Sequence, residues 1–112
     1  MGLIDGIKKL LYTDKNIKQS RFLCAKLHDS HVKYSSEKIN DVETIIGREG
    51  HLNIVEDKIF EYTVGVKSIF RFNIDQMTIW EFMSLDGAVI TGFDLNLERE
   101  RTVTVYYDRH LT

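Results

Sequence analysis

Four histidines, with one aspartate, are the first residues of the sequence that could bind a metal ion. His28, Asp29 and His31 stand within four positions of one another, whereas His51 and His110 lie elsewhere in the chain. Two histidines in a tight turn can share a cation, but a zinc site usually needs a third and a fourth ligand at defined positions. The sequence does not show that other ligands converge on this turn. We therefore interpret the histidines as exposed turn residues, and we assign neither a metal nor a cofactor.

Two carboxylates form the next candidate site. In the register that an Asp86-Gly87 turn predicts, Glu81 and Asp94 lie diagonally on one face of a hairpin, near enough to act as a general acid and base. Gly92, opposite Glu81, would leave room for a substrate. The alternative is structural: either acid forms a salt bridge with an arginine on an adjacent strand, or Asp94 turns outward at the strand end. We adopt the structural interpretation.

Cys24 is the single cysteine and therefore the one candidate thiol nucleophile. A nucleophilic thiol needs a base beside it, and no family signature surrounds this residue. In a predicted alternating strand, Cys24 is instead a small buried apolar group. A single cysteine cannot form an intramolecular disulfide, and this favours a reducing, cytoplasmic location. We predict no catalytic residue, and keep a small hydrolase or metal enzyme as an alternative function.

The composition is that of one globular domain, residues 1–112. Hydrophobic residues make up 43% of the chain, charged residues make up 29%, and the net charge is −2. These fractions are typical of a folded chain with a single core. The lysines and arginines are scattered, so the sequence lacks the positive field that attracts phosphates. This argues against nucleic acid as a partner.

Residues 1–14 are predicted to form an N-terminal amphipathic helix. The apolar positions follow helical spacing, and the charged residues lie on the other side; the apolar set is Leu3, Ile4, Ile7, Leu10 and Leu11. So short a helix needs a surface to lie on. The segment "GLIDGIKKLL" resembles the opening of the aurein antimicrobial peptides over about ten residues, and the resemblance implies affinity for a membrane surface if the apolar face is free. Peripheral membrane contact is therefore a further alternative.

Residues 21–109 are predicted to form a β domain, because the apolar period changes to two. Strands are expected at 21–27, 31–35, 51–55, 59–64, 66–74, 77–85, 88–95 and 101–109. The stretch 36–47 is compatible with a capped helix ending at Gly47 or with a loop leading into a strand, and we leave it open. A three-residue turn at 56–58 is selected because it places Leu52, Ile54, Phe60 and Tyr62 on one face.

The hairpin within residues 77–95 is apolar on both faces. Asp86-Gly87 between alternating apolar residues predicts a type I′ turn that pairs Leu85 with Ala88 and Trp80 with Phe93. If Asp75-Gln76 is also a two-residue turn, Phe70, Phe72 and Ile74 join the face of Ile79 and Met83, which we take as the core. A three-residue turn there would reverse the assignment of the preceding strand.

The opposite face of this hairpin has the composition of a contact surface. It combines aromatic side chains with a cation, and such residues supply most interface hot spots; the predicted binding residues are Arg71, Trp80, Phe82 and Phe93. Either the N-terminal helix or a second copy of the chain would cover this face. In the last strand, one of Tyr106 and Tyr107 should likewise face solvent or a partner.

These observations lead to one expected architecture and one expected function. The fold class is mainly β: an antiparallel sandwich or partly open barrel of seven to nine short strands with an N-terminal amphipathic helix. A barrel like that of pleckstrin-homology domains would accommodate the strands, but it normally closes with a C-terminal helix, whereas this chain ends in a strand. We expect a non-catalytic binding or assembly module that associates with itself or with another protein.

Overall fold

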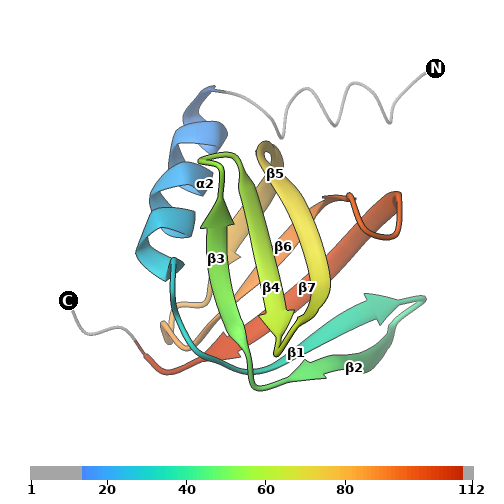
Figure 1. The fold of residues 1–112 in the computed structure, drawn as a ribbon. Coiled ribbons are helices and arrows are strands. Elements are labelled where there is room, and N and C mark those ends of the chain that lie inside the picture. The colour runs from blue at the N-terminus through green and yellow to red at the C-terminus, as the bar shows by residue number, and fades with distance from the viewer. Residues whose placement is uncertain (1–13, 110–112) are drawn as a thin grey trace.

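The structure is a computed structural model that describes residues 14–109. Within this range it contains one helix and seven strands (Figure 1). They are α2 (Asp14–Leu27), β1 (Val32–Ile39), β2 (Val42–Arg48), β3 (His51–Val55), β4 (Ile59–Val64), β5 (Lys67–Glu81), β6 (Gly87–Asp94) and β7 (Arg99–Tyr107). The prediction of a mainly β protein is confirmed. Residues 1–13 of the predicted N-terminal helix, which hold its apolar contact residues from Leu3 to Leu11, lie outside the described residues.

All seven strands belong to one antiparallel sheet with the order β2-β1-β7-β6-β5-β4-β3. Strands β3 to β7 form a meander, and β1 lies beside β7, so the β1–β2 hairpin forms one margin of the sheet. Among the described residues the edge strands β2 and β3 do not pair, and the sheet is not closed into a barrel. One open sheet packed against a helix therefore takes the place of the predicted sandwich or partly open barrel.

Strand β5 is the longest strand and bends the sheet around the core (Figure 1). It pairs with β4 over its first half and with β6 over its second half, and its register with β6 shifts between Phe72 and Met77. At the bend, the backbone N–H of Asp75 donates to the side-chain oxygen of Asn73 at 3.0 Å. The predicted turn at Asp75-Gln76 is therefore wrong, because the chain bends there and continues as the same strand.

Residues 21–27 are helical, and the predicted strand at this position is wrong. The buried residues of α2 are Ser20, Leu23, Cys24 and Leu27, which are spaced three, one and three positions apart and therefore lie on one helical face. That face packs against β5 and, to a smaller extent, against β3. Phe22 points away from the core and is exposed. Because this exposed ring stands among apolar residues in "RFLCAKL", the segment was misinterpreted as a strand with an apolar period of two. No helix within residues 14–109 is long and apolar enough to cross a membrane.

The stretch that the sequence left open forms the β1–β2 hairpin. Ile39 pairs with Val42, and the two turn residues Asn40 and Asp41 both have positive φ angles, 50° and 64°. Two successive positive φ angles are the geometry of a type I′ turn, and asparagine and aspartate tolerate it better than most residues. Residues 36–47 therefore contain neither a helix nor an extended loop.

The β3–β4 hairpin has the predicted register. Leu52 pairs with Tyr62, Ile54 pairs with Phe60, and residues 56–58 form the turn. Three residues in the turn keep the apolar side chains of both strands on one face. The sequence pattern and the turn length were sufficient to predict this register, because both depend only on residues close together in the chain.

The β5–β6 connection differs from the prediction. Glu81, rather than Leu85, pairs with Ala88, and residues 82–86 form the loop. The backbone carbonyl of Asp86 accepts a hydrogen bond from the backbone N–H of Tyr107 at 3.0 Å, so Asp86 bonds with the end of β7 rather than forming the corner of a tight turn. The pairing is shifted by four residues, an even number, so the side chains that stay paired keep their predicted faces. Met83 and Leu85, which were predicted on the core face, lie instead in the loop, where Met83 is fully exposed.

The core lies inside the bend of the sheet, between the sheet and α2. Its members come from the helix and from all strands except β2; they include Leu23, Leu27, Val32, Leu52, Phe60, Tyr62, Phe70, Phe72, Ile79, Ile90, Val103 and Tyr107. The face containing Phe70, Phe72, Ile74 and Ile79 is buried, as predicted. We call this side of the sheet the inner face and the opposite side the outer face.

Candidate interaction surface

The outer face carries a transverse row of side chains across five strands. Trp80 of β5 pairs with Val89 of β6, Val89 pairs with Thr104 of β7, Thr104 pairs with Ser36 of β1, and Ser36 pairs with Ile45 of β2. Paired residues of neighbouring strands project to the same side of a sheet, so the five side chains form a continuous row. Trp80 is 50% exposed and Ile45 is 42% exposed. Both ends of this row are therefore open to a partner.

A second row of aromatic rings lies beside the first. Tyr106 of β7 pairs with Tyr34 of β1, and their rings stack with centroids 4.3 Å apart. The ring of Phe82 packs against Tyr106 at 5.8 Å. Burial and the nearby carboxylate of Glu43 raise the pKa of the Tyr106 phenol, so this hydroxyl stays protonated at neutral pH. The row presents rigid apolar rings with polar tips, which suits a protein interface.

The four predicted binding residues do not all lie together. Trp80 and Phe82 are close in sequence at one end of the outer face, but Trp80 pairs with Val89 rather than with Phe93. Phe93 pairs with Glu100 at the far end of β6 and is 43% exposed. Arg71 lies in the first half of β5, where its Nε atom is 3.4 Å from the Glu61 carboxylate. Arg71 therefore forms an ion pair with an acid of β4.

Sequence reasoning missed the contribution of β1 to this surface. Tyr34 and Tyr106 are far apart in the sequence, and only the pairing of β1 with β7 brings their rings into contact. The expectation that one tyrosine of the Tyr106–Tyr107 pair turns outward is confirmed, since Tyr107 is buried and Tyr106 lies in the aromatic row. Alternation within β7 predicts that Tyr106 and Tyr107 point to opposite faces. No sequence pattern near Tyr34 indicated that this ring would lie against Tyr106.

A cluster of charged side chains lies on the inner face where β1, β6 and β7 meet. The guanidinium group of Arg101 donates to both carboxylate oxygens of Glu37, at 2.8 and 3.1 Å, and to Asp94 at 2.9 Å. It also donates to the backbone carbonyl of Ile69 at 3.0 Å. All three charged side chains are buried. Glu37, Arg101 and Asp94 therefore connect three strands and the backbone of a fourth.

The pKa values within this cluster follow from its geometry. Hydrogen bonds from Arg101 lower the pKa of Glu37, and a hydrogen bond from Arg99 lowers it further. Burial acts in the opposite direction but is outweighed. Burial acts against the charged form of Arg101, but hydrogen bonds to Glu37 and Asp94 outweigh it and raise the pKa. Glu37 and Arg101 therefore both stay charged at neutral pH, and each has a hydrogen-bonded partner of opposite sign.

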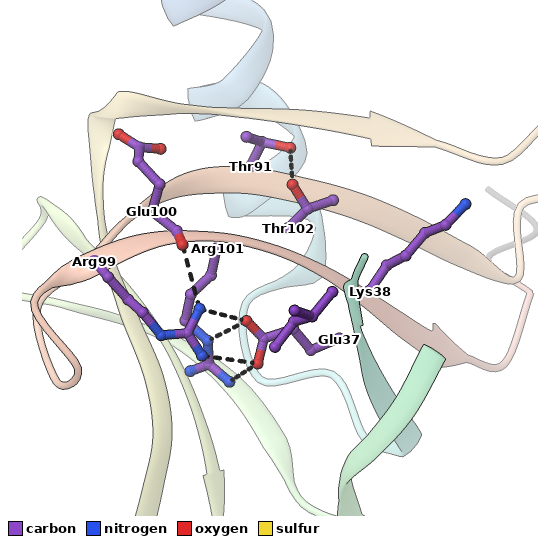
Figure 2. Close-up of a pocket in the computed structure, with 8 residues that line it drawn as sticks. Glu37, Lys38, Thr91, Arg99, Glu100, Arg101 and Thr102 are labelled. Atoms are coloured by element: carbon purple, nitrogen blue, oxygen red, sulfur yellow. Dashed lines mark hydrogen bonds and ion pairs between the residues drawn. The ribbon is translucent and has the colours of Figure 1, made fainter. Parts of the chain in front are cut away.

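A pocket of about 230 Å³ lies beside this cluster (Figure 2). It is lined by residues of β1 and β7 together with Thr91 of β6. Figure 2 shows Arg99 and Arg101 converging on the carboxylate of Glu37, while Lys38 points away from them. Because both guanidinium groups bind Glu37 and Arg101 also binds Asp94, these cations already have acidic partners, and we interpret the pocket as a structural junction.

The residues that the sequence offered for acid–base chemistry are engaged elsewhere. Glu81 accepts hydrogen bonds from Lys26 at 3.0 Å and from the hydroxyl of Tyr107 at 2.8 Å. Asp94 binds Arg101, so the predicted alternative of a salt bridge to an arginine on an adjacent strand is confirmed. The two acids sit near opposite ends of β6, next to Ala88 and at its last residue, and do not form a pair.

The histidines and the cysteine are also accounted for. The Nδ1 atom of His28 accepts a hydrogen bond from the backbone N–H of Ile54 at 2.9 Å, and His31 contacts the Glu49 carboxylate at 2.5 Å. Within residues 14–109, no three histidine, cysteine, aspartate or glutamate side chains are grouped to hold a metal ion. Burial raises the pKa of the Cys24 thiol, which favours the unreactive protonated form.

Comparison of the chain with protein-family models, with curated proteins and with solved structures gives no match.

Proposed function

We propose that this protein is a non-catalytic assembly module that associates with itself through the outer face of its sheet, with Trp80 as the principal contact residue. The observation that carries the proposal is the half-exposed indole of Trp80 in a row of paired strands, at 50% of its full exposure. A tryptophan on a soluble surface is unusual unless it contacts a ligand or a partner, and tryptophan is enriched among interface hot spots.

The neighbours of Trp80 support this role. Val89 lies directly opposite on β6, and the stacked rings of Tyr34 and Tyr106 follow in the adjacent row. These side chains are held by strand pairing and by ring contacts, so they lose little conformational freedom when a partner covers them. In a two-fold contact the same patch of both subunits is buried, so the aromatic rings of one copy would pack against those of the other.

The test is the oligomeric state of the full chain. Light scattering coupled to size exclusion, followed by sedimentation equilibrium, should show a self-associating wild type and a dissociation constant roughly 30-fold higher for Trp80→Ala, which corresponds to a loss of about 2 kcal/mol. Met83→Ala is the matched control, because Met83 is a fully exposed apolar residue that lies in the loop after β5. Circular dichroism verifies that both variants fold. Unchanged association of a folded Trp80→Ala variant would overturn the proposal.

A further inference from the structure

The two edge strands of the sheet differ in whether their outer backbone groups have partners. On β3, the backbone N–H of Leu52 donates to Ser30 at 3.0 Å, and the carbonyl of Leu52 accepts from Asp29 at 2.6 Å. The side chain of His28 accepts from the N–H of Ile54, and His51 forms a bridge with His31. The segment after α2 therefore covers the β3 edge.

The β2 edge has no such cover among the described residues. Strand β2 is last in the sheet order, and its ladder partner is β1 alone. Val42 is 63% exposed and Ile45 is 42% exposed. Natural edge strands are usually protected by charged side chains, proline, a β-bulge, a covering segment or very short length. The β2 sequence "VETIIGR" is seven residues long, is rich in β-branched residues and contains neither lysine nor proline; its charged side chains are Glu43 and Arg48, and its pairing with β1 has one register shift, between Ile45 and Gly47.

We propose that β2 pairs in antiparallel fashion with β2 of a second copy of this chain, about a two-fold axis at Ile45. This inference rests on the proposed self-association and adds a second contact to it. In such a pair, Ile45 lies opposite Ile45 of the partner subunit, and the backbone groups of both edges are satisfied. The two seven-stranded sheets become one continuous sheet.

The charges on β2 match this arrangement. Glu43, Ile45 and Arg48 all project from the outer face. Each pairs with a residue of β1 on that face, namely Lys38, Ser36 and Tyr34 respectively. Arg48 lies on the same face as Ile45, although it is three positions later, because the register shift between Ile45 and Gly47 adds one residue. Arg48 has no ion-pair partner within residues 14–109. Reversal of the second strand about Ile45 brings Arg48 of the partner subunit toward Glu43, and the symmetry repeats the contact. Opposite charges on adjacent antiparallel strands favour this pairing.

The pairing also has a consequence for the outer face. A two-fold axis that relates two antiparallel edge strands stands perpendicular to the sheet, so the outer faces of both copies lie on the same side. The row from Trp80 to Ile45 then continues into the same row of the partner, in reverse order. The contact through Trp80 would join two such pairs rather than form the pair itself.

The inference is tested with the full chain by comparing Ile45→Lys with Trp80→Ala. At the two-fold axis, Ile45→Lys places two lysines opposite one another, and we expect edge pairing to weaken more than about tenfold. Val66→Lys is the matched control, because Val66 is fully exposed in the β4–β5 turn. Sedimentation velocity should show that each single variant loses one of two contacts and that the double variant is a monomer.

Charge reversal provides a second, independent readout. Arg48→Glu places two carboxylates near each other across the edge and should weaken association, whereas the double variant Glu43→Arg with Arg48→Glu should restore it. If folded Ile45→Lys associates as the wild type does, the β2 inference is overturned while the Trp80 contact stands. If Trp80→Ala alone associates as the wild type does, the proposed function is overturned and edge pairing remains. A monomeric wild type overturns both.

Discussion

On the inner face of the sheet, Glu37, Asp94 and Arg101 are buried charges that bind one another, whereas on the outer face Trp80 is an apolar side chain left half exposed. Each arrangement is an exception, because charged side chains are almost never fully buried unless they are paired and tryptophan is highly buried on average. The inner exception is compensated within the molecule, because each charge has a hydrogen-bonded partner of opposite sign. The outer exception has no compensation within residues 14–109, and this is why we interpret it as a contact surface.

The two faces differ in how much their side chains contribute to folding. The inner cluster fixes the position of β1 relative to β7 and of the β6–β7 turn, since Asp94 also accepts from the backbone N–H groups of Arg71, Asn96 and Leu97. Removing one member leaves a buried charge unpaired. The outer aromatic rings are only partly buried, so we expect the removal of one to cost association more than folding.

The largest expected effect is the loss of the inner cation. Arg101→Ala should lower the free energy of unfolding by about 3–5 kcal/mol, because Glu37 and Asp94 stay buried without their partner. Urea unfolding followed by circular dichroism measures it. Arg99→Ala is the control, since the half-exposed Arg99 also binds Glu37, at 2.9 Å, and should cost less than about 1 kcal/mol. Equal losses in the two variants would mean that burial does not distinguish these ion pairs.

A pair of adjacent residues on β5 separates the two faces directly. Ile79→Ala should cost about 2–5 kcal/mol of stability, because Ile79 is buried in the core and its truncation leaves a cavity. Trp80→Ala, one position later on the outer face, should cost less, about 1–2 kcal/mol, because half of the indole is already exposed. Both are measured by urea unfolding at a protein concentration low enough to keep the chain monomeric, since association adds to apparent stability. A larger loss for Trp80→Ala would show that the indole belongs to the core.

An intermediate effect is expected at Gly87, where the outer face approaches the backbone. A Cβ atom at this position would lie 2.7 Å from the Phe82 ring and 2.9 Å from the carbonyl oxygen of Val105. Gly87→Ala should therefore lower stability by about 1–3 kcal/mol through overpacking. Thermal unfolding of Gly87→Ala with and without Phe82→Ala tests the cause, because removal of the ring should recover part of the loss. An undiminished loss in the double variant would assign the effect to the backbone contact.

The smallest expected effect concerns the protonation of Glu37, which occurs in acid. Its pKa in the folded protein is lowered from the ordinary value of 4.5, chiefly by Arg101. The stability that this lowered pKa provides is fully present when the pH is above the pKa of Glu37 in the unfolded chain. It is lost as the pH falls through the lower pKa of Glu37 in the folded protein. The difference in melting temperature between wild type and Glu37→Gln should thus shrink as the pH is lowered from about 6 to about 3. A difference that stays constant over this range would show that Glu37 does not titrate there.

Much of the local structure followed from the sequence because it depends on neighbouring residues. The β3–β4 register came from alternation and a three-residue turn, and the placement of Ile79 and Trp80 on opposite faces came from the period of two in β5. The helix at 21–27 was missed because exposed Phe22 interrupts the apolar pattern of Leu23, Cys24 and Leu27. A window of seven residues holds fewer than two full helical turns, so one exposed ring is enough to mislead it.

From the sequence we could predict that the chain is mainly β and that Ile79 and Trp80 lie on opposite faces of one strand. The choice of the Ile79 face as the core depended on a turn at Asp75-Gln76 that the structure does not contain. Only the tertiary structure decided that Glu37 meets Arg101, that Tyr34 stacks on Tyr106 and that β2 is left at an open edge. The physical reason is that alternation assigns a side chain to a face, whereas the identity of its cross-strand neighbour depends on strand order and register. These are set by contacts between residues far apart in the chain, such as the pairing of β1 with β7.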